Sequence, residues 1–132
     1  MKKLITLLAV ISILNINAQQ YTKLFDFNGT NGAHPAGSLM SDGTYLYGMT
    51  YGGVSDSGLI YKIKPDGTGY QRLFYFNEIS GINPDGSLIS DGIYLYGVTS
   101  EGGINGGGTI FKIKPDGTGF QKIFDFNGAN GI

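Results

Sequence analysis

The sequence contains no cysteine, no tryptophan and a single histidine, His34. Without cysteine there is no disulfide framework and no thiolate zinc cluster, and one histidine cannot build a multi-histidine metal site. Charged residues make up only 14 % of the chain and the net charge is -1, so no basic surface is expected for DNA, RNA or anionic lipid. We therefore expect no metal, no cofactor and no nucleic-acid partner.

The chain also lacks an apolar run of the ~20 residues that a permanent membrane helix needs. Its apolar run covers only residues 4–14, behind the basic residues Lys2 and Lys3, and it leads to Ala18. This layout is typical of a secretory signal peptide, and it favours one over a retained membrane anchor. We predict a signal peptide over residues 1–18, cleaved after Ala18, and an exported protein that is extracellular, at the cell surface or periplasmic.

Glycine is abundant, with 23 of 132 residues, and the glycines belong to an internal repeat. Residues 21–69 align with residues 70–119 at roughly 30 of 49 positions, a period within the ~50-residue range of propeller repeats. A third copy begins at residues 120–132. We therefore predict one repeat region over residues 19–132, which places the chain among tandem-repeat proteins.

Each repeat divides into four short extended segments, which in the first copy are residues 38–42, 45–50, 58–64 and 70–77. Asp42 and Gly43 are typical of a tight hairpin between the first two segments. Alternation in the Phe-rich segment places Phe25 and Phe27 on one face, which must be buried. The sequence thus predicts an all-β protein of tandem four-stranded antiparallel blades in a β-propeller-like arrangement, and a parallel β-helix is the less favoured alternative.

The strings Leu-Tyr-Gly-Met-Thr-Tyr-Gly-Gly at 46–53 and Leu-Tyr-Gly-Val-Thr-Ser-Glu-Gly-Gly at 95–103 resemble the GloVer (Gloeo/Verruco) tandem repeat. The Phe-rich segments that lead into Asn and then into Pro-x-Gly at 35–37 and 84–86 resemble it as well. The resemblance implies an exported, repetitive, propeller-like bacterial protein, often longer than this chain and with a surface-anchoring or sorting domain. The family supplies no catalytic residues to transfer.

Counting the segments gives about two blades plus one extra strand, because residues 21–28 form a fourth-type segment without its three partners. We expect the chain to be the N-terminal fragment of a longer protein, since a ring needs about four to eight blades. The alternative is a short subunit that closes a ring by oligomerising. Either way, further blades are the expected partners, supplied by a longer chain or by other copies.

No catalytic constellation is apparent, because the repeated Asp-Gly pairs are explained by turns and no paired acid is present. The chain is predicted to be a non-catalytic repeat scaffold for binding or surface structure. The alternatives are part of a propeller enzyme whose active site lies beyond residue 132, and a small oligomeric lectin with a glycan ligand. We align Tyr51 with Glu101 of the next copy. The candidate ligand-binding residues lie in loops that differ between the copies: Tyr51, Asp56, Glu101, Asn105 and His34.

Overall fold

The computed structural model describes residues 19–53 and 56–131, so the predicted signal peptide lies outside the described residues. Two four-stranded antiparallel sheets follow one another along the chain, each with its strands in sequence order. We call them blade 1 and blade 2. Blade 1 consists of β1 (Ala33–Ser41), β2 (Leu46–Gly52), β3 (Leu59–Ile63) and β4 (Gln71–Tyr75). Blade 2 consists of β5 (Ile82–Ser90), β6 (Leu95–Glu101), β7 (Thr109–Ile113) and β8 (Gln121–Asp125).

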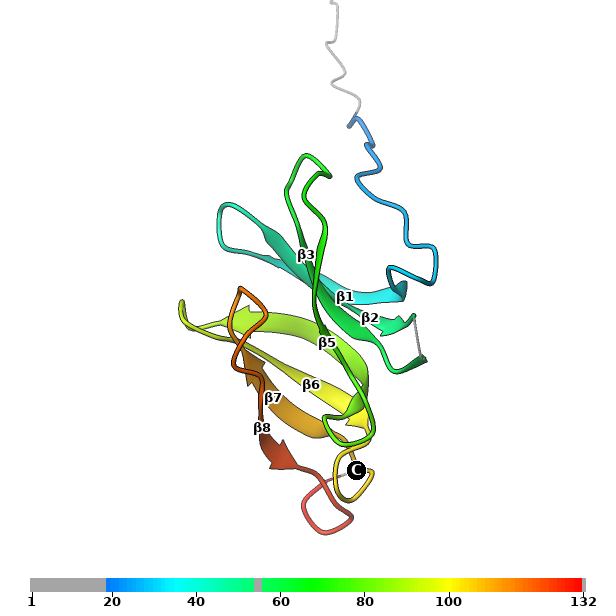
Figure 1. Ribbon diagram of the computed structural model, residues 1–132, viewed down its shortest axis with the longest axis vertical. Helices are drawn as coiled ribbons and strands as arrows, with labels where there is room; N and C mark the ends of the chain where they lie inside the picture. The colour runs from blue at the N-terminus through cyan, green and yellow to red at the C-terminus, as the bar shows by residue number, and fades with distance from the viewer. Residues whose placement is uncertain (1–18, 54–55, 132) are drawn as a thin grey trace, which may run out of the picture.

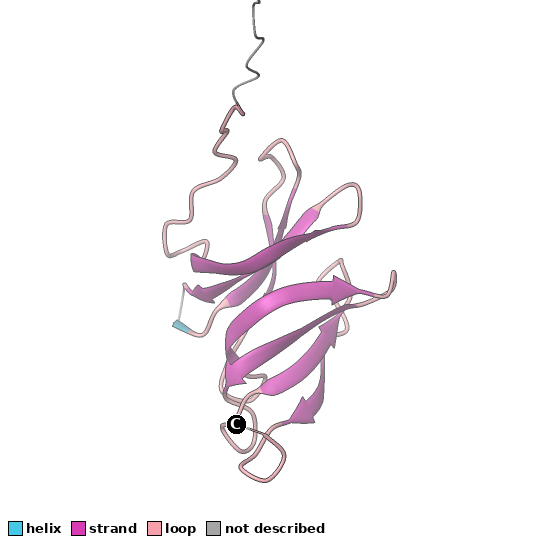
Figure 2. Ribbon diagram, turned by 180° about the vertical axis from the view of Figure 1, so that it is seen from behind, coloured by secondary structure: helices cyan, strands magenta, loops and turns pink. Residues whose placement is uncertain are grey.

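The predicted all-β architecture of tandem four-stranded blades is confirmed. The blades are stacked with one sheet face of each turned toward the other, as Figures 1 and 2 show from opposite sides. The stacking brings β5 against both β1 and β2. Neighbouring repeats in the sequence are therefore neighbours in space.

The hairpins form where the Asp-Gly pairs are placed in the sequence. The Asp42 carboxylate accepts hydrogen bonds from the backbone N–H groups of Thr44 (2.8 Å) and Tyr45 (2.7 Å), and from the Tyr47 hydroxyl (2.8 Å). Gly43 has a φ of +91°, which glycine adopts without a steric penalty. The second blade repeats this arrangement around Asp91, so one turn chemistry fixes the register of both blades.

The first strand of each blade is longer than predicted: β1 begins at Ala33 and not at residue 38, and β5 begins at the equivalent Ile82. The Pro-x-Gly segment hid the early part, since proline normally interrupts a strand. Here β1 lies at the edge of its sheet, where proline is tolerated, and Pro35 lies opposite Thr50. A bulge follows, in which the register shifts between Ala36 and Met40.

Residues 21–28 do not form the predicted fourth-type strand. A fourth strand pairs with the third strand of its own sheet, and the two sheets of the described residues include no third strand of a blade before blade 1. The segment still lies on blade 1 (blue in Figure 1), where Phe25 stacks on Tyr70 with ring centroids 4.4 Å apart. The predicted pairing of Phe25 and Phe27 on one face is seen, because their rings meet edge to face at 5.3 Å.

The main hydrophobic core lies between the blades. We call the face of a blade that is directed as blade 1 is directed toward blade 2, that is toward the next repeat in the sequence, its forward face. The opposite face is its rear face. The forward face of blade 1 packs against the rear face of blade 2, and both are buried. The forward residues are Tyr47, Met49, Ile60 and Phe76, and the rear residues are Leu88, Leu95, Phe111 and Ile113. Burial of this apolar surface is the main force that joins the blades.

Candidate functional site

The loops that differ between the copies gather at one end of the blades. The backbone N–H of Gly103 in the β6–β7 loop donates to the carbonyl of Glu78 in the loop between the blades, at 2.8 Å. Gly53 in the β2–β3 loop lies close to Gly29 and Gly32 in a similar way, since a Cβ at position 53 would be 3.0 Å from the Gly32 Cα and 3.3 Å from the Gly29 carbonyl oxygen. We call this end, formed by residues 28–32, 53, 56–58, 77–81 and 102–108, the loop rim.

The inter-blade loops of the rim are closed by asparagine side chains. The Asn28 side-chain oxygen accepts hydrogen bonds from the backbone N–H groups of Thr30 (3.1 Å) and Asn31 (3.2 Å). Asn77 makes the same turn, with Ser80 in the place of Asn31. These polar side chains therefore satisfy their own backbone, which is the usual role of asparagine in such turns.

One ion pair holds the rim of blade 2. Lys122 lies 2.9 Å from the Asp125 carboxylate, which also accepts the backbone N–H of Ile104 at 2.9 Å. The hydrogen bond from Lys122 holds the pKa of Asp125 below its ordinary value. In blade 1 the same two positions carry Arg72 and Tyr75, with the guanidinium 5.3 Å from the ring centroid. Both blades thus have a cationic side chain at the first of these positions, and its partner three residues later is a carboxylate in blade 2 and an aromatic ring in blade 1.

The candidate ligand-binding residues Tyr51, Asp56, Glu101, Asn105 and His34 are all exposed. Tyr51 lies in β2 with 45 % of its surface exposed. No hydrogen bond or ring contact joins any two of the five in the part of the chain that the structure describes. The register of β1 and β2, in which Ala33 lies opposite Gly52 and Pro35 opposite Thr50, does place His34 opposite Tyr51.

The strand register corrects one detail of the repeat alignment. Ala33 pairs with Gly52, and its counterpart Ile82 pairs with Glu101, so Glu101 corresponds to Gly52. The counterpart of Tyr51 is therefore Ser100 and not Glu101. The extra residue of the second copy falls later, in the β6–β7 loop, where an insertion does not disturb the sheet.

The repeated aspartates are engaged in their own turns. Hydrogen bonds from the backbone N–H of Tyr94, the Tyr96 hydroxyl and the backbone N–H of Ile93 lower the pKa of Asp91 to about 2. Asp66 accepts from both the backbone N–H and the hydroxyl of Thr68, at 2.9 and 2.7 Å, and its pKa is likewise lowered. Among residues 19–53 and 56–131, no three His, Asp or Glu side chains are grouped so that they could hold a metal ion.

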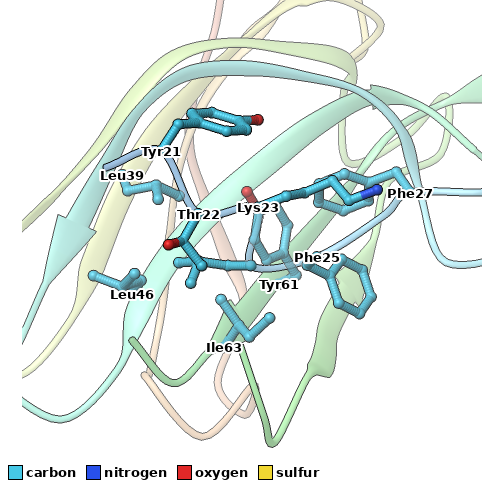
Figure 3. A pocket seen from close by; sticks show the side chains of 10 residues that line it. Tyr21, Thr22, Lys23, Phe25, Phe27, Leu39, Leu46, Tyr61 and Ile63 are labelled. Carbon is cyan, nitrogen blue, oxygen red and sulfur yellow. The ribbon is translucent and has the colours of Figure 1, made fainter. Parts of the chain in front are cut away.

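The hollows of the surface lie on the free faces of the two blades. We call residues 21–28 the opening segment. On the rear face of blade 1, a hollow of ≈ 200 Å³ is lined by Leu39, Leu46 and Ile63 and by residues of the opening segment (Figure 3). On the forward face of blade 2, a hollow of ≈ 490 Å³ is lined by Val98, Thr99 and Phe126 among others. None of the five candidate ligand-binding residues lines these two hollows. The residues that do were not candidates, because the same residue types at the same repeat positions form the buried core between the blades.

The fold defines the chain as a tandem array of propeller-like antiparallel blades, built from two copies of one repeat. The chain belongs to the Gloeobacter/Verrucomicrobia repeat family, whose model matches residues 9–132. This finding confirms the resemblance seen in the sequence.

Among solved structures, the crystal structure of the tricorn protease is similar to this chain at 22 % sequence identity, with a TM-score of 0.46. The similarity covers 68 % of this chain, which spans only 8 % of that one. No curated protein matches the sequence. Within residues 19–53 and 56–131, no helix has the length and apolar character needed to cross a membrane.

Proposed function

We propose that this protein is an exported, non-catalytic scaffold that presents its loop rim for binding or for surface structure. One observation carries the proposal: the residues that the two repeats share are used for turns and for contact between blades. Asp42 and its counterpart Asp91 close hairpins. Tyr47 and Leu88, which are also identical in the other copy, belong to the core between the blades. Shared chemistry therefore maintains the blades, while the rim differs between the copies, for example at Thr30 and its counterpart Ile79.

The rim of blade 2 offers a surface suited to a partner. Ile79 is 76 % exposed and Ile104 is 79 % exposed, and they lie on adjacent loops joined by the Gly103–Glu78 hydrogen bond. The carboxylates of Glu78 and Glu101 are exposed beside them. Exposed large apolar side chains bordered by polar groups are a common feature of interaction surfaces. The rim is thus the part of the scaffold that we expect to bind.

Export is tested by expressing the full chain in a bacterium and separating cytoplasm, periplasm and medium. We expect the protein outside the cytoplasm, with an N-terminus at Gln19 by mass spectrometry. A matched variant, Leu7→Arg with Leu8→Arg, interrupts the apolar run and should keep the chain uncleaved in the cytoplasm. An uncleaved wild-type chain retained in the cytoplasm would contradict the proposed export.

Binding at the rim is tested with a glycan array probed by the folded, purified chain. Specific binding that is lost in the Ile79→Ser and Ile104→Ser variants, but kept in Ile93→Ser at the opposite hairpin, would support the rim. A blank array with a folded sample would remove the lectin alternative.

A further inference from the structure

Each blade presents the same two faces, but only the inner face of each is covered by another blade. On the rear face of blade 1, Phe25 and Phe27 pack against a buried cluster of Leu59, Tyr61 and Ile63. Leu88 on the rear face of blade 2 is 3 % exposed, whereas its counterpart Leu39 on blade 1 is 50 % exposed. Met49 on the forward face of blade 1 is 1 % exposed, whereas its counterpart Val98 on blade 2 is 42 % exposed. The molecule therefore carries one half of its own inter-blade interface at each end.

The hydrogen bonds across the inner interface have counterpart positions on the two outer faces. The Asn83 N–H donates to the Ser57 carbonyl at 3.1 Å, and the Ser38 N–H donates to the Ser87 hydroxyl oxygen at 2.7 Å. The Lys62 amine donates to the Pro115 carbonyl at 3.3 Å. An outer interface in the same register would pair His34 with Gly107, Ser87 with Ser38 and Lys112 with Pro65. The two residues of each pair would belong to two different molecules.

The bulges of β1 and β5 also show contacts in the inner interface that have open counterparts on the outer faces. Gly37 lies so close to blade 2 that a Cβ there would be 1.8 Å from the Gly86 carbonyl oxygen, whereas a Cβ at Gly86 would meet nothing within 4 Å. Gly58 is pressed against Pro84 in the same way, with a Cβ position 2.5 Å from the proline ring. The three atoms nearest the Cβ position of its counterpart Gly108 all belong to the backbone of Thr99 and Ser100, and Pro35, the counterpart of Pro84, is exposed.

We propose that the forward face of blade 2 docks on the rear face of blade 1 of a second copy of this chain, head to tail. The occupant is a second copy because both halves of the interface are present in one chain and repeat the contacts of the inner interface. Such a contact is not self-complementary, so it continues from copy to copy until a ring closes or a filament grows.

The opening segment competes for the aromatic part of this docking face. Phe25 stacks on Tyr70 at 4.4 Å as Phe74 stacks on Phe120 at 3.9 Å. Phe27 meets Tyr61 edge to face at 5.1 Å and 66°, and Phe76 meets Phe111 at 5.1 Å and 65°. The segment thus imitates the fourth strand of a preceding blade. An incoming copy brings its Phe124 and Phe126 to Tyr70 and Tyr61 and must displace the opening segment from them.

Displacement of the segment is feasible because its backbone forms no strand. Its one ion pair, between Lys23 and Asp26, joins two side chains that are 61 % and 72 % exposed, and it lies within the segment itself. The incoming Phe124 and Phe126 replace the lost ring contacts with equivalent ones. The additional burial of Val98 and Ile110 against Leu39 and Leu46 then favours the docked state.

The experiment is sedimentation velocity of the purified, mass-verified chain over a wide range of concentration. We expect species larger than a monomer to grow with concentration. Val98→Asp introduces a charge into the forward face of blade 2, and Leu39→Asp introduces one into the rear face of blade 1. Each variant should be monomeric alone, because docking would bury the new carboxylate without a partner. Mixed in equal amounts, the two variants retain one intact interface and should form a dimer that does not grow. Ile93→Asp, in a hairpin outside both faces, is the matched control and should associate as the parent does.

Two further variants test the contacts in detail. Gly86→Ala should weaken association by about tenfold or more, because the new Cβ meets the Gly37 backbone of the next copy. Gly92→Ala, at a similar φ in an open hairpin, is its control and should leave association unchanged. Phe25→Ala with Phe27→Ala removes the competitor and should strengthen association by about threefold or more. This gain should disappear when Val98→Asp is added.

Two results would contradict the proposed docking of a second copy. A chain that stays monomeric at every concentration, even with Phe25→Ala and Phe27→Ala, excludes a second copy as the occupant. A dimer that is lost with Leu39→Asp but kept with Val98→Asp shows that two rear faces pair, which also contradicts it. Export or glycan binding has no bearing on either result, so failure of the proposed function is distinguishable.

Discussion

The close approach of the two bulges gives a sharp prediction, because the two equivalent glycines differ in what surrounds them. Gly37 and Gly86 have nearly the same backbone conformation, with φ of +74° and +76°. Alanine at either position pays the same penalty for a left-handed conformation, about 1 to 2 kcal/mol. Only the Gly37→Ala variant also forces its new methyl group onto backbone, at 1.8 Å from the Gly86 oxygen.

The backbone contact cannot be relieved by a side-chain rotation, so the blades must separate. Their separation loosens the core formed by Met49, Ile60 and Leu88. Forcing additional volume into a packed region costs about 1 to 3 kcal/mol beyond the backbone penalty. We therefore expect Gly86→Ala to lower the free energy of unfolding by about 1 to 2 kcal/mol, and Gly37→Ala to lower it by about 2 to 5 kcal/mol.

The assay is urea unfolding of the two variants and the parent, followed by tyrosine fluorescence and by far-ultraviolet circular dichroism. The concentration is kept low enough that sedimentation shows only monomer, because Gly86→Ala also affects the proposed outer interface. Coincident transitions by the two probes are needed for the free energies to be compared. Equal losses in the two variants would refute the reasoning, since the difference rests entirely on the contact between blades.

Three other predictions follow from burial and charge in the monomer. Leu88→Ala should lower the free energy of unfolding by about 2 to 5 kcal/mol and Leu39→Ala by much less, as urea titration would show. Hydrogen bonds lower the pKa of Asp91 to about 2, so the stability that it contributes is present above its unfolded pKa and is lost as the pH falls toward 2. Asp91→Asn should flatten the fall of the urea midpoint over that range, and an unchanged slope would contradict this role. Thr109→Val should cost about 1 to 3 kcal/mol by calorimetry, because the buried Thr109 hydroxyl donates to the Ser80 carbonyl at 3.0 Å.

Local turn chemistry explains why much of the fold could be predicted. Asp42 with Gly43 specifies a hairpin through contacts with the next three residues, so no distant information is needed. The alternation of Phe25 and Phe27 likewise indicates a shared face. The early start of β1 at Ala33 was missed because a strand through Pro35 is possible only at a sheet edge, and sequence alone does not show which strand is at the edge.

The candidate binding residues were chosen from variation between the copies, and the structure adds their surroundings. It leaves Tyr51 and His34 exposed and opposite each other on β1 and β2, and it brings Ile79 and Ile104 onto adjacent loops. No local signal marks those isoleucines, because a contact between the loop before β5 and the loop after β6 depends on how the sheet folds. The insertion after Gly102 also shifted the apparent counterpart of Tyr51.

The sequence by itself determined the strand type, the four-strand repeat and the turns, because these depend on neighbouring residues and on the two-residue period of a strand. Only the tertiary structure decided which apolar faces are covered. Leu39 and Leu88 occupy the same position in the same sequence pattern, yet one is 50 % exposed and the other 3 % exposed. The reason is physical: burial of a sheet face depends on what packs against it. In this chain blade 1 covers one face of blade 2, whereas the rear face of blade 1 is only partly covered, by Phe25 and Phe27.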